Sequence, residues 1–126
     1  MKRDMDLIRL LLMRAAGYED AAAEAEQYPI PQRAFHTALL KDAGYVIAVI
    51  SDDEHGFPAR AATVRLTWQG YEFLQLMWDK TIWNRAKATI IEKGVPWATP
   101  LLIHWLKIQA CSHIPGLEHF LPPEQP

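Results

Sequence analysis

The stretch that decides the fold is residues 31–66, PQRAFHTALLKDAGYVIAVISDDEHGFPARAATVRL. Its first part, 31–43, starts with proline and is followed at once by Gly44, which is the asymmetry expected of a helix. Two segments rich in β-branched and alternating apolar residues follow at 45–50 and 60–66, and the polar turn between them contains Gly and Pro. A helix that runs directly into a hairpin is typical of a winged helix-turn-helix, with the helix as recognition helix and the hairpin as wing.

Helices are expected on both sides of this core. Residues 4–16 place leucine, isoleucine and methionine at helical spacing behind the N-cap Asp4, and the alanine-rich segment 19–27 favours a short helix. Thr67 is a good N-cap, and downstream helices are expected at 68–79, 81–93 and 100–111. The sequence therefore predicts an α+β, mostly helical fold with a winged helix-turn-helix-like core, a two-stranded wing and additional C-terminal helices.

Length and charge narrow the class of protein. The 126 residues suit one domain, expected over 1–111, followed by an irregular tail over 112–126. With 13 basic and 15 acidic side chains the net charge is -2, so a nucleic-acid contact needs a local basic patch. The single cysteine, Cys111, excludes an intrachain disulfide and suits a reducing compartment. The sequence contains neither a signal-peptide pattern nor an apolar stretch of bilayer length, so we expect a soluble, cytoplasmic protein without membrane contact.

Four segments of the sequence form a recognisable set. They are MKRDMDLIR at 1–9, FHTALLKDAG at 35–44, LTWQGYEFL at 66–74 and the pair Trp83 and Asn84. The set resembles a bacterial and prophage family of small proteins known only as a domain of unknown function, and the opening nonapeptide is its most specific part. The resemblance implies a winged-helix-like fold, and it implies no activity and no catalytic residues.

One face of the expected recognition helix carries hydrogen-bond donors. Arg33, Thr37 and Lys41 recur every four residues and are expected to point outward, whereas the inward face is expected to hold Phe35, Ala38, Leu39 and Ala43. Long donors on one helix face can reach base edges and phosphates. The predicted DNA-contacting residues, including those of the wing, are Gln32, Arg33, His36, Thr37, Lys41, Arg60 and Arg65. The alternative is an ordinary solvated helix face.

Acidic and aromatic residues favour a protein partner instead. Phosphates would repel Asp52, Asp53 and Glu54 at the wing tip, and this patch, with another at 19–26, can mimic nucleic-acid charge toward a basic partner. The five tryptophans lie in the C-terminal half, where most are expected in the core. The helix at 100–111 is apolar around most of its circumference, which predicts a homodimer or partner interface at Trp97, Leu102 and Trp105.

The sequence offers no convincing catalytic or metal site. Residues of zinc-ligand type lack the spacing of a zinc motif, and they are His104, Cys111, His113 and His119. Ser51 and Ser112 lie in no nucleophile turn, and there is no Gly-rich phosphate loop. We therefore expect no enzyme activity, no cofactor and no bound metal.

Two functions stay open. The first is a small non-enzymatic regulator or accessory protein of a bacterium or phage, which binds DNA through the 31–43 helix as a dimer. The second is a phage-encoded protein-binding module that inhibits a host defence or nuclease complex through its acidic patches. The first depends on the analogy between folds, which is an association and not a mechanism.

Overall fold

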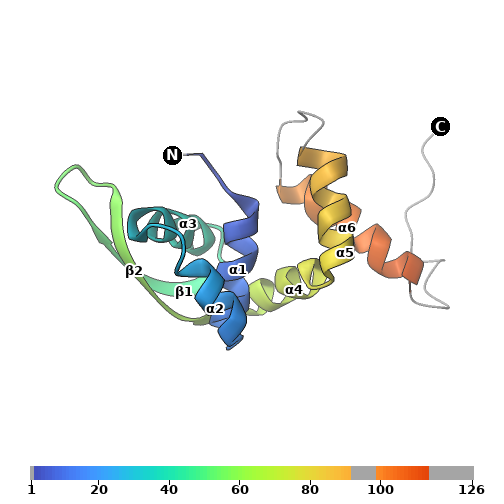
Figure 1. Cartoon of the computed structure of the whole chain (residues 1–126), viewed down its shortest axis with the longest axis horizontal. Helices are drawn as coiled ribbons and strands as arrows, with labels where there is room; N and C mark the ends of the chain where they lie inside the picture. Colours follow the sequence, from blue (N-terminus) through green and yellow to red (C-terminus); the bar gives the residue numbers. More distant parts are fainter. Residues whose placement is uncertain (1, 92–98, 114–126) are drawn as a thin grey trace. The chain divides into compact units, whose positions relative to one another are not determined.

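The computed structural model describes residues 2–91 and 99–113. Over these residues the chain forms α1 (Met5–Ala15), α2 (Glu19–Ala25), α3 (Ile30–Asp42), β1 (Val46–Asp52), β2 (Pro58–Leu66), α4 (Trp68–Met77), α5 (Lys80–Ala86), a π-helical turn η1 (Lys87–Ile91) and α6 (Thr99–His113). The predicted fold is confirmed: it is α+β and mostly helical, with a winged-helix-like core, a two-stranded antiparallel wing and further C-terminal helices (Figure 1).

The chain divides into two compact units, Met1–Leu74 and Gln75–Pro126. The first unit contains the helix–hairpin core, and α4 begins in the first unit and ends in the second. The expected single domain over 1–111 stays a prediction, while α6 continues two residues past the expected helix end at Cys111. No described helix is both long and apolar enough to cross a bilayer.

The core of the first unit is built around α1. Its six buried side chains lie on most sides of the helix, and they are Met5, Leu7, Ile8, Leu10, Leu11 and Leu12. This breadth is possible because α1 packs against α2, α3 and β2 at once. Burying a Leu or Ile side chain stabilises a fold by about 1.5–3 kcal/mol. The expected N-cap is also confirmed, since the Asp4 carboxylate accepts the N–H groups of Asp6 and Leu7.

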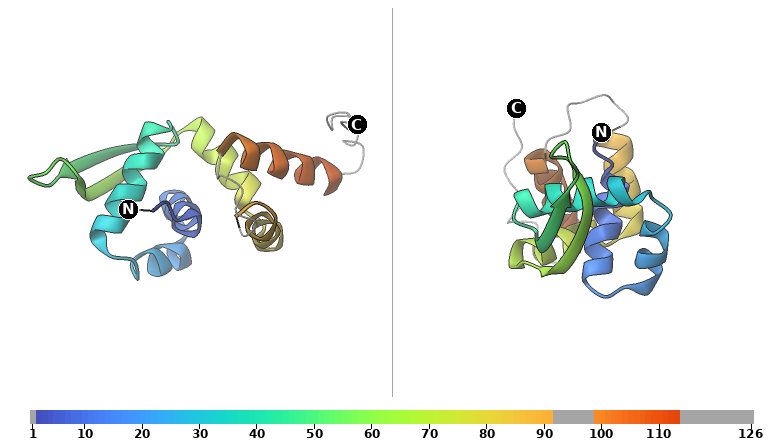
Figure 2. Two further views of the ribbon diagram at one scale, coloured as in Figure 1. Left: turned by 90° about the horizontal axis from the view of Figure 1, so that it is seen from above. Right: turned by 90° about the vertical axis from the view of Figure 1, so that its left-hand side faces the viewer.

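The hairpin presents one face to α3 and the other to solvent. β1 and β2 pair antiparallel, and α3 packs against both strands (Figure 2). The inner face buries Val46, Ala48 and Leu66. The outer face leaves Ile47, Val49 and Val64 exposed at 44%, 63% and 65%. We call these three residues the outer hairpin face. β-Branched residues favour strands, but here they form strand without gaining burial.

A close contact between backbones ties the start of the hairpin to α4. Thr67 Oγ1 donates to the carbonyl of Gly44 at 2.6 Å and accepts the N–H of Gly70 at 3.1 Å, which confirms Thr67 as a cap. The N–H of Thr67 donates to the carbonyl of Tyr45 at 3.0 Å. Gly70 is buried against that same carbonyl, and a Cβ added at Gly70 would lie 2.0 Å from the Tyr45 oxygen. The position therefore requires glycine.

The second unit is described through α5, η1 and α6. Trp83 and Ala86 of α5 are buried, as are Leu102 and Leu106 of α6, and the two helices pack together. Most of the tryptophans were expected in the core, but the structure does not bury most of those it describes. Trp83 is buried, whereas Trp68 and Trp78 are exposed at 76% and 43%.

Candidate nucleic-acid interface

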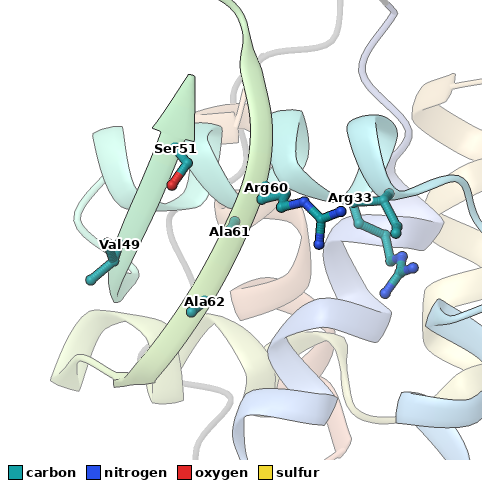
Figure 3. Close-up of a pocket in the computed structure, with 7 residues that line it drawn as sticks. Arg33, Val49, Ser51, Arg60, Ala61 and Ala62 are labelled. Atoms are coloured by element: carbon teal, nitrogen blue, oxygen red, sulfur yellow. The ribbon is translucent and has the colours of Figure 1, made fainter. Parts of the chain in front are cut away.

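A shallow groove of about 350 Å³ is lined by the first turns of α3 and by the hairpin, including Val49 of the outer hairpin face. Three polar side chains line it, Arg33 from α3, Ser51 from β1 and Arg60 from β2, and its apolar wall consists of Ile30, Val49, Ala61 and Ala62. Figure 3 shows Arg60 extending from β2 toward the side of α3 that carries Arg33. We call this the α3–hairpin groove. It brings together two of the predicted DNA-contacting residues, Arg33 and Arg60, which are 27 positions apart in the chain.

The donors of the groove are largely unengaged. Arg33 Nε donates to the carbonyl of Tyr28 at 3.0 Å, which fixes the side chain and leaves its terminal nitrogens without a hydrogen-bond partner among the described residues. Within the same described part of the chain, no hydrogen bond or ion pair engages the side chains of Ser51 and Arg60. Both of these residues are exposed. The groove thus offers two guanidinium groups and one hydroxyl to a ligand.

A third cation stands near Arg33. The pKa of Arg14 is lowered below its ordinary value, mainly by burial and then by the neighbouring Arg33 guanidinium. The Glu26 carboxylate acts in the opposite direction and offsets part of this lowering. Arg14 lies in the last turn of α1. Sequence reasoning missed this residue, because α1 and α3 meet only in the folded chain. Arg14 and Arg33 therefore lie close together, with the negative charge of Glu26 beside Arg14.

The expectation that Thr37 points outward is wrong, and His36, which was expected beside the outward face, is buried too. Both side chains are buried, at 1% and 0% exposure. Each is satisfied by a carbonyl four residues earlier: Thr37 Oγ1 donates to Arg33 at 2.9 Å, and His36 Nδ1 bonds to Gln32 at 2.7 Å. Buried polar groups are tolerated when they are hydrogen-bonded. Neither residue is available to touch DNA.

The rotation of α3 about its own axis also differs from the expectation, so other side chains than those predicted face outward. The side opposite the buried residues carries Pro31, Phe35, Ala38 and Asp42, which offer no side-chain donor to base edges. The prediction that Phe35, Ala38, Leu39 and Ala43 face inward is therefore wrong. Ala43 is exposed, and the other three are only half-buried. The helix instead buries Ala34, His36, Thr37 and Leu40.

The other predicted contacts lie apart from the groove lining. Gln32 is half-buried on α3, and Lys41 is exposed in the last turn of that helix. Arg65 is exposed on β2, and its Nη1 donates to the carbonyl of Leu66 at 3.2 Å. These residues can add contacts at the edges of a bound polyanion, but they do not shape a site.

The acidic wing tip has a partly structural role. Asp52, Asp53 and Glu54 are all exposed, as predicted. The Asp53 carboxylate accepts the N–H groups of His55 and Phe57 at 2.8 and 3.0 Å, so it holds the loop closed. Its substitution would therefore disturb the loop as well as the charge, whereas Asp52 and Glu54 can be changed more safely.

The expected interface on the last helix is partly wrong. Leu102 is completely buried within the chain, so it cannot meet a partner without unfolding. Trp105 is half-buried, and Trp97 lies outside the described residues. Among the side chains that the structure describes, no group of three or more His, Cys, Asp or Glu residues is placed to hold a metal ion. His119 and the side chain of His113 lie outside that part of the chain.

The first unit combines a winged-helix-like core with a groove that two arginine side chains line. Residues 2–96 match the family described as Hypothetical protein (DUF2513), and the chain belongs to this family. A Haemophilus influenzae protein described as uncharacterized is 32% identical over an alignment of 102 residues that covers 75% of this chain and 83% of that protein. No solved structure matches the chain. The expected membership of a family of unknown function is confirmed at this level.

Proposed function

We propose that the first unit binds DNA through the phosphate backbone, with Arg33 and Arg60 as its main contacts. The observation that supports this function is that two guanidinium groups from different elements open into one groove. Arginine pairs with phosphate oxygens through two parallel donors, and such contacts supply most of the sequence-independent affinity for DNA. Since the outward face of α3 lacks donors, we expect little discrimination between base sequences.

The test measures binding to a fluorescent duplex over a range of salt concentrations. We expect Arg33→Ala and Arg60→Ala each to weaken binding about tenfold, because a charge-assisted hydrogen bond contributes roughly 1.5–3 kcal/mol. Each change should also reduce the salt dependence by about one released counterion. Unfolding curves must show that Arg33→Ala still folds, since Arg33 also bonds to Tyr28.

Arg85→Ala is the matched control for this experiment. Arg85 is exposed in the second unit, and its loss changes the net charge by the same amount as the loss of Arg60. Its affinity for the duplex should stay within about twofold of wild type. A wild-type protein that binds no duplex at low salt would contradict the proposal, and so would an equal loss of affinity in the control.

The second candidate is a protein-binding module, and the outer hairpin face favours it. The three β-branched side chains of this face remain exposed to water. A two-stranded sheet needs apolar packing to be stable, and on this face the chain itself provides none. Contiguous exposed apolar surface is typical of interaction sites. The exposed acids Asp52 and Glu54 continue the same hairpin toward its tip. A basic partner in a host defence or nuclease complex fits this combination.

This candidate predicts selective loss of a partner. Val64→Lys should abolish retention of proteins that wild type retains from cells, because a lysine cannot be buried in an apolar interface without a counter-charge. Since Val64 is 65% exposed, the fold itself should change by less than about 0.5 kcal/mol. Arg60→Ala serves as the control on the same strand. Equal retention by Val64→Lys and wild type would reject the outer hairpin face as the interface.

The homodimer expected from the sequence also stays a prediction. Sedimentation should give the mass of two chains if it forms, and a monomer at micromolar concentration contradicts it. The wider role as a bacterial or phage regulator belongs to the DNA-binding proposal, and the anti-defence role belongs to the protein-binding one.

A further inference from the structure

We infer that the α3–hairpin groove is a site for a phosphate monoester carried by a single nucleotide, either a free mononucleotide or the end of a DNA strand. This inference deepens the proposed DNA binding, and it depends on that function only for the source of the phosphate. The groove holds two guanidinium groups, a hydroxyl and an adjoining apolar wall, all within about 350 Å³. Each of these features matches one part of a nucleotide.

The charge of the groove suits a dianion. Arg33 and Arg60 supply two positive charges, and none of the described residues that line the groove is acidic. A phosphate monoester carries a charge of about −1.5 to −2 at pH 7, whereas each internal phosphodiester of DNA carries one negative charge. Two guanidinium groups therefore match the charge of a terminal phosphate more closely than the single charge of a backbone phosphate. Arg14 also lies near Arg33, and its positive charge is partly offset by Glu26.

The donors also match the oxygens of a monoester. A terminal phosphate has three free oxygens that accept hydrogen bonds. Arg33 is held by its Nε bond to Tyr28, so its terminal nitrogens are already oriented. Arg60 and Ser51 lie opposite each other on the paired strands, which places a guanidinium group and a hydroxyl on neighbouring strands at one level of the hairpin. Because the Arg33 guanidinium is held in advance, it loses little entropy when it binds a ligand.

The size of the groove and its apolar wall suit a ligand of about one nucleotide. The volume of the groove lies at the lower end of the range for small-molecule sites, roughly 300–1,000 Å³. Ile30 and Val49 are exposed at 46% and 63%, so they offer apolar surface for a sugar or base beside the cations. A nucleoside on this wall would remove both side chains from water. Inorganic phosphate lacks this contribution and should bind more weakly.

Titration calorimetry with four probes tests the first part of the inference. The probes are inorganic phosphate, deoxyadenosine monophosphate, deoxyadenosine and a short phosphoserine peptide. We expect the monophosphate to bind most tightly, inorganic phosphate about tenfold more weakly, and deoxyadenosine not at all at millimolar concentration. Absence of monophosphate binding overturns the site, and tighter binding of the phosphoserine peptide overturns the nucleotide as its source.

Paired oligonucleotides test the second part. A strand with a 5′-phosphate should bind about tenfold more tightly than the same strand with a 5′-hydroxyl. Arg60→Gln should remove this preference, because the exposed guanidinium is lost without disturbing the fold. Ser51→Ala should reduce it severalfold. Arg65→Gln, which changes an exposed arginine outside the groove lining, should leave it intact.

The outcomes separate this inference from the proposed function. Duplex binding that requires Arg33 and Arg60 but ignores the 5′-phosphate contradicts the inference and leaves the DNA-binding function standing. Binding of the monophosphate without binding of any duplex supports the site and contradicts that function. Loss of the 5′-phosphate preference in Arg65→Gln as well as in Arg60→Gln shows a diffuse charge effect and overturns the groove as the site.

Discussion

Replacing Gly70 with alanine should cost the protein at least about 2 kcal/mol of unfolding free energy and lower its Tm by about 8 °C or more. The new Cβ would lie 2.0 Å from the carbonyl oxygen of Tyr45 and 3.3 Å from Leu66 Cδ2. Alanine gains about 1 kcal/mol of helix propensity over glycine, but backbone atoms cannot give way as a flexible side chain does. The chain must shift where α4 begins, and that shift disturbs the 3.0 Å bond from Thr67 to Tyr45.

Gln69→Ala is the matched control for Gly70→Ala. It introduces alanine one position earlier in the same helix, at an exposed residue. Thermal and urea unfolding should show it as stable as wild type or slightly more stable. If both variants unfold at the wild-type midpoint, the close approach of α4 to Tyr45 does not exist in the protein.

The same contact explains why part of the fold could be predicted from the sequence. In the element Leu66-Thr67-x-x-Gly70, the residue types themselves indicate the structure. Thr67 provides a capping hydroxyl, and Gly70 stands where two backbones meet. The proline near the start of α3 and the alternation of β2 act through equally local rules. Such features fix elements and their order, and the observed helix–hairpin–helix order follows them.

The orientation of α3 could not be predicted in the same way. Its polar and apolar residues are mixed, so the helix has no clear apolar stripe. The placement of His36 and Thr37 inside depends on carbonyls of their own helix and on the N–H of Asp4, 32 positions away. A pattern of apolar side chains cannot predict the burial of a polar residue whose hydrogen-bond partners come into place only on folding.

Only part of the candidate site could be predicted from the sequence, for a related reason. Arg33 and Arg60 stood among the predicted contacts, but nothing in the sequence indicated that they share a groove with Ser51. Arg14 was absent from the prediction because its proximity to Arg33 arises where α1 meets α3. Exposure of Trp68 was likewise missed, because the size of a side chain favours burial but does not place it.

His36→Leu should destabilise the protein by about 2–3 kcal/mol although leucine is apolar and similar in size. His36 Nε2 accepts the N–H of Asp4 at 2.7 Å, and its ring meets Phe35 edge to face with centroids 5.3 Å apart. Leucine fills the space but leaves the Asp4 N–H and the Gln32 carbonyl without this partner. His36→Gln keeps an acceptor near the position of Nε2, so it should lose only about 1 kcal/mol.

Hydrogen exchange at the Asp4 amide separates this bond from mere packing. Exchange should be slow in wild type, faster in His36→Gln and fastest in His36→Leu, whereas Lys41→Ala, on an exposed position of the same helix, should leave it unchanged. Equal protection in the leucine variant would show that the bond does not hold. Because Asp4 caps α1 and His36 lies on α3, the bond joins the helix of Arg14 to that of Arg33. At a temperature where His36→Leu is fully folded, it should therefore bind the duplex less tightly than wild type but more tightly than Arg60→Ala.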